Sequence, residues 1–509
     1  MGLHGGHRVG EVCMGGRRQF VAIALVLVLA AAAGFVWAAI RPRGQAADVR
    51  AQGQSLLDAT AREIRTKFIV RSINETEIYE GAGRGLLDAA GPACSRLIGT
   101  SPAPPAADGR QRIAALVDEA TQRCTTPRPD PQRLYFGAAK GMLDSLGDQY
   151  TRFMDTRAFD EFKQDSQGFF FGIGIFIDLK DKHLIVVQPI SGTPAARAGL
   201  RAGDRITEID GASTDGMALQ EAVVRIRGPK GSSVHLVILR GGRAVAVTIV
   251  RDRIEIVAGE GAGSLDEATR ARLDDAGIGY VKLVTFNENT ELAFRRLFER
   301  AKQSGARALI LDLRSNGGGL LDVSLRVADW FVPAGQALVH TVDRDGRKET
   351  ERATRRVKVE VPVVVLVNEF TASASEIVSG ALQDHRVATL VGVRTFGKGV
   401  IQTIVDLPMG SGAAITTAKY LTPSGRDIHG KGLWPDEFVG ATEDTVRLRF
   451  HGQPDDAIEQ QLQQMRAAQL ARAIEILKKK LSRSLHRLPT VPHAVAAPPA
   501  AWHGAAAAA

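Results

Sequence analysis

Two short segments of the chain carry residue types that can act together as a nucleophile and a general base. Asn368-Glu-Phe-Thr-Ala-Ser-Ala-Ser-Glu-Ile-Val holds two serines, Ser373 and Ser375, and Phe396-Gly-Lys-Gly-Val-Ile-Gln-Thr-Ile holds Lys398. A serine hydroxyl needs a base to take its proton while it attacks a carbonyl. A lysine can be that base once burial lowers its pKa from ~10.4 to ~7–8. Taken singly, each segment has an ordinary explanation, a helix-capping serine and a solvated turn lysine.

The elements around these segments would place them at one edge of a sheet. The serine segment follows an apolar strand over 361–367 and enters a helix from about Ala372, where unpaired backbone N–H groups favour a developing oxyanion. In open α/β sheets, ligand crevices form at the carboxyl ends of the strands. We therefore expect the N–H of Ala374 to be one oxyanion donor. A glycine of the run after the strand 308–313, Gly318 or Gly319, could be the second, unless the run only forms a tight turn.

The order of several blocks resembles the carboxyl-terminal processing (tail-specific) protease family. The blocks run from about Leu134 to Asp436 and comprise Gly147-Asp-Gln-Tyr-Thr-Arg-Phe-Met, a PDZ-like region, Leu311-Asp-Leu-Arg-Ser-Asn-Gly-Gly-Gly, the two segments above, and Tyr420-Leu-Thr-Pro-Ser-Gly-Arg.

The resemblance assigns roles to individual residues. It implies that Ser373 is the nucleophile, that Lys398 is the general base and that Gln402 orients this lysine. Strand geometry agrees, because residues four apart face the same side. Ser375 is the rival nucleophile and His429 a rival base.

The fold class that these patterns favour is a multidomain α/β protein. Continuous apolar strands that alternate with helices after about Val257 indicate a buried, largely parallel sheet. The resemblance implies a crotonase/ClpP-like ββα protease core with an inserted, β-rich PDZ-like domain. The predicted parts are a cytoplasmic N-terminus (1–19), a transmembrane signal anchor (20–40), an N-terminal helical region (46–165), a PDZ-like domain (166–256), the protease core (257–445), a C-terminal helix (446–482) and a disordered Ala/Pro-rich tail (483–509).

The helical region contains two similar segments. Tyr79, Gly81, Gly85 and Asp88 line up with Tyr135, Gly137, Gly141 and Asp144. The similarity is either a repeat or a chance likeness of two amphipathic helices.

The PDZ-like region offers a site for chain ends. Its carboxylate-binding loop and first strand are expected at Phe171, Gly172, Ile173, Gly174 and Ile175. Backbone N–H groups there could capture a C-terminus while the strand edge pairs with the peptide. Arg227 matches an arginine pattern that could couple this domain to the protease.

Composition excludes several other functions. The net charge of +9 over 509 residues comes from Lys and Arg spread along the chain, so no nucleic-acid partner is expected. The 11 histidines lack zinc-helix spacing, and neither a P-loop nor a dinucleotide fingerprint occurs. We predict no metal and no cofactor.

The N-terminal segment predicts the location. Residues 20–40 carry no charge and are long enough to cross a core of ~30 Å, so we expect a single-pass inner-membrane protein with its catalytic domain in the periplasm. Cleavage of this segment as a signal peptide is the alternative. Cys94 and Cys124 would both lie on the oxidising side, where they could form a disulfide.

The predicted function is that of a serine endopeptidase that recognises C-terminal tails through its PDZ-like domain and processes or degrades exported proteins. Its expected partners are proteins with accessible C-terminal tails, the inner membrane, and a second copy of the chain or an adaptor. One alternative is a catalytically inactive PDZ-bearing scaffold. Another is a hydratase that uses the glycine loop to hold a thioester oxyanion.

Overall fold

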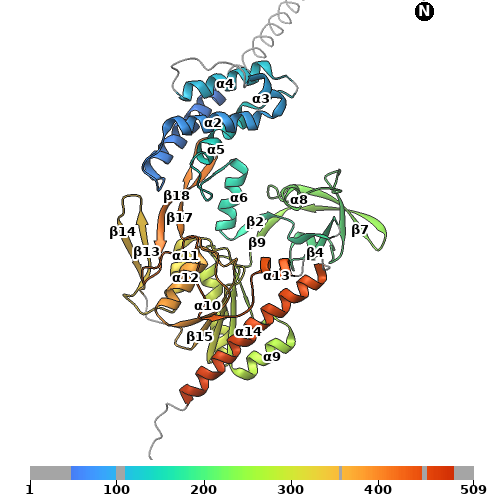
Figure 1. Cartoon of the computed structure of the whole chain (residues 1–509). Helices are drawn as coiled ribbons and strands as arrows, with labels where there is room; N and C mark the ends of the chain where they lie inside the picture. The colour runs from blue at the N-terminus through green and yellow to red at the C-terminus, as the bar shows by residue number, and fades with distance from the viewer. Residues whose placement is uncertain are drawn as a thin grey trace, which may run out of the picture. The chain divides into compact units, whose positions relative to one another are not determined.

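A computed structural model describes residues 48–98, 109–125, 127–180, 182–354, 358–449 and 455–485 (Figure 1). The predicted segments 1–19 and 20–40, and nearly all of 483–509, lie outside these ranges. The chain divides into two compact units. The first holds the residues up to 161 together with 343–345 and 401–418. The second holds 162–342, 346–400 and the residues from 419 onward.

The first unit is mainly helical. Residues 48–67 are helical, and further helices follow at α2 (Glu75–Ala90), α3 (Pro92–Ile98), α4 (Gly109–Arg123) and α5 (Pro131–Asp144). Asn74 and Asp130 begin α2 and α5 by accepting backbone N–H bonds two residues on. Strand β1 (Arg152–Met154) pairs antiparallel with β18 (Gly412–Leu421), which also pairs with β17 (Val400–Asp406).

The two similar segments form α2 and α5, which pack against each other. A Cβ placed on Gly81 would lie 2.4 Å from the carbonyl oxygen of Gly141, and one on Gly85 would lie 2.1 Å from that of Gly137. The shared glycines therefore allow the two helix backbones to touch. The predicted disulfide between Cys94 and Cys124 is confirmed, and both cysteines are buried.

The second unit is built on a six-stranded sheet whose strands all run in the same direction except the first, which pairs antiparallel with its single neighbour. Its order is β10 (Gly259–Gly261), β11 (Ile278–Leu283), β12 (Ala308–Asp312), β15 (Val363–Val367), β16 (Ala388–Gly392) and β19 (Glu437–Phe438). All residues of β12 and β15 are buried, as expected for strands covered on both faces.

Helices cover both faces of this sheet. One face shares an apolar core with α9 (Glu267–Ala276) and α14 (Asp455–Leu485), the long helix that crosses the sheet in Figure 1. Gly279 faces α10 (Thr290–Gln303) on the other side, since a Cβ there would lie 2.8 Å from that of Ala301. The remaining elements are η1 (Ala262–Ser264), α11 (Leu321–Ala328), α12 (Ala374–Asp384), α13 (Glu443–Arg449) and the hairpin of β13 (Ala337–Asp343) and β14 (Lys348–Arg352).

A smaller sheet with its own core precedes the large one. After α6 (Thr156–Ser166), β2 (Phe169–Gly172) pairs with β9 (Asp252–Glu255), and the chain between them forms the small domain. Its strands lie in the order β3 (Ile175–Lys180), β4 (His183–Pro189), β5 (Arg205–Ile209), β7 (Ser233–Arg240) and β8 (Arg243–Val250), with β6 (Ala212–Ser213), α7 (Pro194–Arg197) and α8 (Leu219–Ile226) completing it. The predicted multidomain α/β class is confirmed.

The predicted single-pass inner-membrane location needs correction. Among the described residues, no helix combines the length and the apolar character that a membrane crossing requires. The segment on which that prediction rested, 20–40, lies outside the described residues.

Candidate active site

Three loops meet the carboxyl-terminal edge of the large sheet. They follow β12, β15 and β16, and they carry the glycine run, Ser373 and Lys398 respectively. Because these strands are parallel neighbours, their carboxyl ends lie at the same edge.

Ser373 stands at a sharp turn between β15 and α12. Its φ of 55° and ψ of −117° are unusual for a residue other than glycine, and it is the residue directly before the helix. Its side chain is half-buried, so the hydroxyl is not sealed in the core. A strained turn that leads into a helix N-terminus is an arrangement that suits a nucleophile with an adjacent oxyanion site.

Lys398 is half-buried and lies between two glycines that both touch other backbone segments. A Cβ on Gly397 would lie 2.7 Å from the backbone nitrogen of Gly432, and one on Gly399 would lie 2.8 Å from that of His429. A larger residue at either position would displace the loop. The Gly-Lys-Gly pattern therefore has a packing reason, which is to seat the lysine loop closely on the chain at 428–432.

The carboxylate of Glu376 joins the serine loop to the lysine loop. Its Oε2 accepts the backbone N–H groups of Ser373 and Lys398, each at 2.9 Å. Its Oε1 accepts the hydroxyl of Thr395 at 2.5 Å and the N–H of Gly397 at 2.8 Å. Glu376 is completely buried, and this burial raises the pKa of its carboxyl, although the four donors act in the opposite direction.

Tyr420 forms a second link between the same loops. Its hydroxyl donates to the carbonyl of Ser373 at 3.1 Å, and its backbone N–H donates to the carbonyl of Gly399 at 3.0 Å. Sequence reasoning assigned no role to Glu376 or Tyr420. The available signal was that both lie inside the matched blocks, three residues after Ser373 and at the start of Tyr420-Leu-Thr-Pro.

The glycine run lies directly against the nucleophile. A Cβ on Gly318 would lie 2.9 Å from both the Cβ of Ser373 and the backbone nitrogen of Ala374. The N–H of Gly318 donates to Oδ1 of Asn316 at 2.9 Å, whereas its carbonyl accepts from Phe286. Of the two predicted glycine donors, Gly318 thus already has an acceptor for its N–H.

The surroundings of the two rival residues differ from those of Ser373 and Lys398. Ser375 is fully buried, and its hydroxyl donates to the carbonyl of Asn316 at 2.9 Å. The backbone N–H of His429 donates to Asp427 in the segment on which Gly399 rests.

Gln402 lies in β17, in the part of this strand that belongs to the first unit, and its Nε2 is buried.

The five predicted tail-binding residues fall into two strands. Phe171 and Gly172 belong to β2 and pair with β9. Ile173 is buried in the core of the small domain, and Gly174, with a φ of 77°, precedes Ile175 at the start of β3. Because β3 is an edge strand, it offers unpaired backbone groups along one side.

Arg227 ends α8 and contacts the entry to the small domain. Its guanidinium carbon lies 4.4 Å from the ring centroid of Phe170, and its Nη1 lies 3.7 Å from Oδ1 of Asp165.

Over the ranges that the structure describes, no group of three or more His, Cys, Asp or Glu side chains could hold a metal ion.

Comparison with known proteins decides the family. Residues 277–439 match Peptidase family S41, and residues 185–240 match the PDZ domain. The chain is 39% identical over 322 residues to a carboxy-terminal-processing protease of Bartonella bacilliformis, which covers 61% of this chain and 70% of that protein. It belongs to the carboxy-terminal-processing proteases.

Two further similar proteins were found. A carboxyl-terminal-processing protease of Synechocystis is 38% identical over 306 residues, or 60% of this chain and 70% of that protein. A solved photosystem II D1 C-terminal processing protease is 29% identical and covers 76% of this chain and 93% of that structure, with a TM-score of 0.43. Carboxy-terminal-processing proteases of this family are serine-type peptidases, so this protein is a serine peptidase with a PDZ domain.

Proposed function

We propose that this peptidase cuts its substrates with Ser373 as nucleophile and Lys398 as general base. The observation that carries the proposal is the shared carboxylate oxygen of Glu376, which holds the backbones of these two residues side by side. The neutral amine of Lys398 takes the hydroxyl proton as Ser373 attacks the peptide carbonyl, and the resulting ammonium protonates the leaving amine. Gln402 orients the lysine, a role that rests on the family resemblance.

The oxyanion of the tetrahedral intermediate is bound by two backbone donors. Ala374 N–H is the first, because it follows the nucleophile at the helix N-terminus. Gly319 is the stronger glycine candidate, since the N–H of Gly318 already donates to Asn316. The glycine run could serve because it lies in contact with Ser373 and Ala374.

The substrates are proteins with accessible C-terminal tails. A tail adds to the open edge of β3, with its carboxylate near Phe171–Ile175. Arg227 transmits tail binding, because it joins α8 to the ribbon at which the PDZ domain begins. We place the substrates among exported proteins, since the Cys94–Cys124 disulfide is a bond that persists in oxidising compartments.

The test is cleavage of a tail peptide and labelling by a fluorophosphonate, which reacts with activated serines. Ser373→Ala and Lys398→Ala should each lower kcat by ~10³-fold or more while the protein stays folded. Ser373→Ala should also lose the label. Ser375→Ala should keep the label at Ser373, because the Ser375 hydroxyl is buried on Asn316. Undiminished cleavage by Ser373→Ala would overturn the proposal.

A further inference from the structure

A glutamine is buried on the apolar side of the C-terminal helix α14. Gln469 is only 1% exposed and precedes Leu470, which packs with Ala473, Ile474 and Leu477 into the core beneath the large sheet. A buried amide costs free energy unless its polar atoms have partners. Its Nε2 donates to the carbonyl of Val439 at 3.1 Å, and its Oε1 accepts from Nη1 of Arg314 at 3.1 Å.

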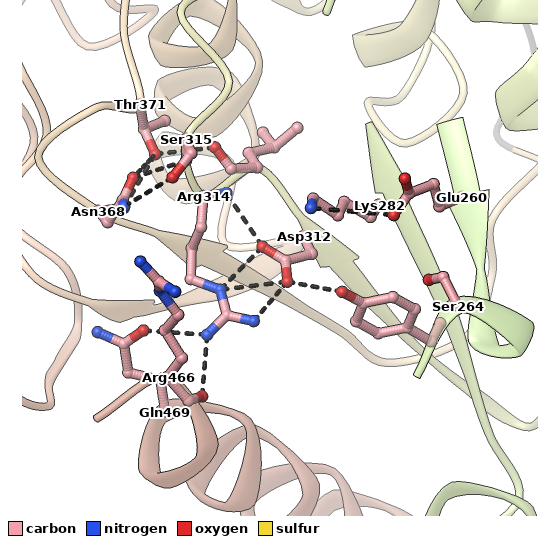
Figure 2. A network of polar contacts seen from close by, with 12 residues as sticks. Glu260, Ser264, Lys282, Asp312, Arg314, Ser315, Asn368, Thr371, Arg466 and Gln469 are labelled. Atoms are coloured by element: carbon pink, nitrogen blue, oxygen red, sulfur yellow. Dashed lines mark hydrogen bonds and ion pairs between the residues drawn. The ribbon is translucent and has the colours of Figure 1, made fainter. Parts of the chain in front are cut away.

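Arg314 is the residue that this glutamine holds, and it lies at the start of the glycine loop. Figure 2 shows its guanidinium between Asp312 on one side and α14 on the other. Nε and Nη2 bond to the carboxylate of Asp312, while Nη1 donates to Gln469 and to the backbone carbonyl of Arg466 at 2.9 Å. Asp312 is buried and also accepts the hydroxyl of Tyr280 at 2.8 Å. Helix α14 therefore supplies the acceptors for Nη1, the guanidinium nitrogen that does not bond to Asp312.

A short stretch with several backbone hydrogen bonds leads from Arg314 to the glycine run at 317–319. The backbone N–H of Arg314 donates to Asp312 at 3.0 Å, and the next residue, Ser315, turns with a φ of 60°. Asn368 fixes that turn, because its Oδ1 accepts the N–H of Ser315 at 2.8 Å. The carbonyl of Asn316 then accepts the N–H of Ala372 at 3.1 Å, one residue before the nucleophile.

We propose that α14 acts as a latch, which means that it holds the glycine run 317–319 (the oxyanion loop) in place. Arg314 and Gln469 are then positioning residues for catalysis. The inference rests on the proposed function, since it assumes that Ser373 attacks and that the glycine run helps to bind the oxyanion. Loss of Gln469 removes one of the acceptors that hold the guanidinium of Arg314. The turn at 314–315 is then held less firmly, and the loop at 317–319 shifts against Ser373. A donor that is misplaced stabilises the transition state less and leaves substrate binding unchanged.

The experiment measures peptide cleavage and the affinity for a peptide boronate, which forms a tetrahedral adduct with an active serine. Gln469→Leu replaces the amide with an apolar side chain of similar size and removes both contacts. It should lower kcat about tenfold, less than the ~10²-fold loss of a whole oxyanion donor, with KM unchanged. Boronate affinity should fall by the same factor. Gln469→Glu keeps an acceptor for Arg314 and should restore both values. Rates are expressed per active site, titrated with fluorophosphonate, so that only folded molecules count.

Gln464→Leu is the matched control, because Gln464 is an exposed glutamine on the same helix. It should behave as the wild type. Equal kcat and boronate affinity in Gln469→Leu and wild type would overturn the latch while the nucleophile stands. A Gln469→Glu variant as impaired as Gln469→Leu would also overturn it, because the effect would then come from Val439. Equal boronate affinity in wild type and Ser373→Ala would overturn the proposed nucleophile and this inference with it.

Discussion

Two buried carboxylates near the same edge of the large sheet have opposite kinds of partner. Asp312, at the end of β12, bonds to the guanidinium of Arg314 through both of its oxygens. Glu376, in the first turn of α12, accepts only backbone N–H groups and one hydroxyl. Both are at most 1% exposed, so the difference between them lies in the charge of the partner and not in burial.

The two sites show how a fold can keep a charge out of water in two ways. Burial opposes ionisation of Asp312, but the attraction and hydrogen bonds of Arg314 outweigh it, and the pKa of Asp312 lies below its usual value. At Glu376 burial outweighs the neutral donors, and the pKa lies above its usual value. The ion pair of Asp312 and Arg314 suits a structural role, because Arg314 also bonds to α14. The neutral donors suit a position beside a lysine that must lose its proton, because a carboxyl with a raised pKa is more readily neutral and then stabilises the ammonium form of that lysine less.

Removing the carboxylate from the ion pair should have the largest effect. Asp312→Asn leaves the guanidinium of Arg314, itself mostly buried, without its counter-charge, and we expect a loss of ~3–5 kcal/mol in the free energy of unfolding. Urea unfolding of the inactive Ser373→Ala background measures it. Asp322→Asn is the matched control, because Asp322 pairs with Arg326 at 2.6 Å on the surface and should change stability by less than ~1 kcal/mol. Equal losses in the two variants would contradict the contrast.

Replacing the carboxylate of Glu376, which has only neutral donors, should act on catalysis. In the wild type, each carboxylate oxygen of Glu376 accepts two hydrogen bonds. In Glu376→Gln, an NH₂ group replaces one of these oxygens. One pair of donors would face another donor, and the serine and lysine loops would move apart. A displacement of about 1 Å can cost ~10²-fold in rate, so we expect a loss of that order in kcat for a tail peptide.

Tyr420→Phe gauges the second link between the same loops. It removes one hydrogen bond to Ser373 and should lower kcat by no more than ~10-fold, in line with the ~0.5–1.5 kcal/mol of a neutral hydrogen bond. If Glu376→Gln retained kcat within a few-fold of wild type, the carboxylate would not be the joint between the loops.

The sequence predicted the strands and loops well, but it did not predict the roles of Glu376 and Gln469. Apolar runs such as 361–367 identify buried strands because every residue of such a strand faces a covered side. Ser373 and Lys398 could be singled out because their residue types match a known chemistry. Glu376 resembled an ordinary residue of a first helical turn, and Gln469 resembled one more polar position on a long helix. Their roles depend on contacts with Lys398 and Arg314, which lie 22 and 155 residues away in the chain.

The contrast can finally be measured as two pH dependences of opposite sign. A depressed folded-state pKa, as at Asp312, contributes stability that is lost as pH falls through that pKa, so the stability advantage of wild type over Asp312→Asn should shrink in acid. A raised pKa, as at Glu376, means that the folded state takes up a proton first. The stability of wild type relative to Glu376→Gln should therefore grow as pH falls toward the ordinary range of a glutamate. Each slope is limited to ~1.4 kcal/mol per pH unit. Urea unfolding between neutral pH and pH ~4 measures the slope for Glu376, and the series continues below pH ~4 for Asp312, because its lowered pKa places the loss under the ordinary range of an aspartate. Slopes of the same sign would show that the partner's charge does not distinguish the two sites.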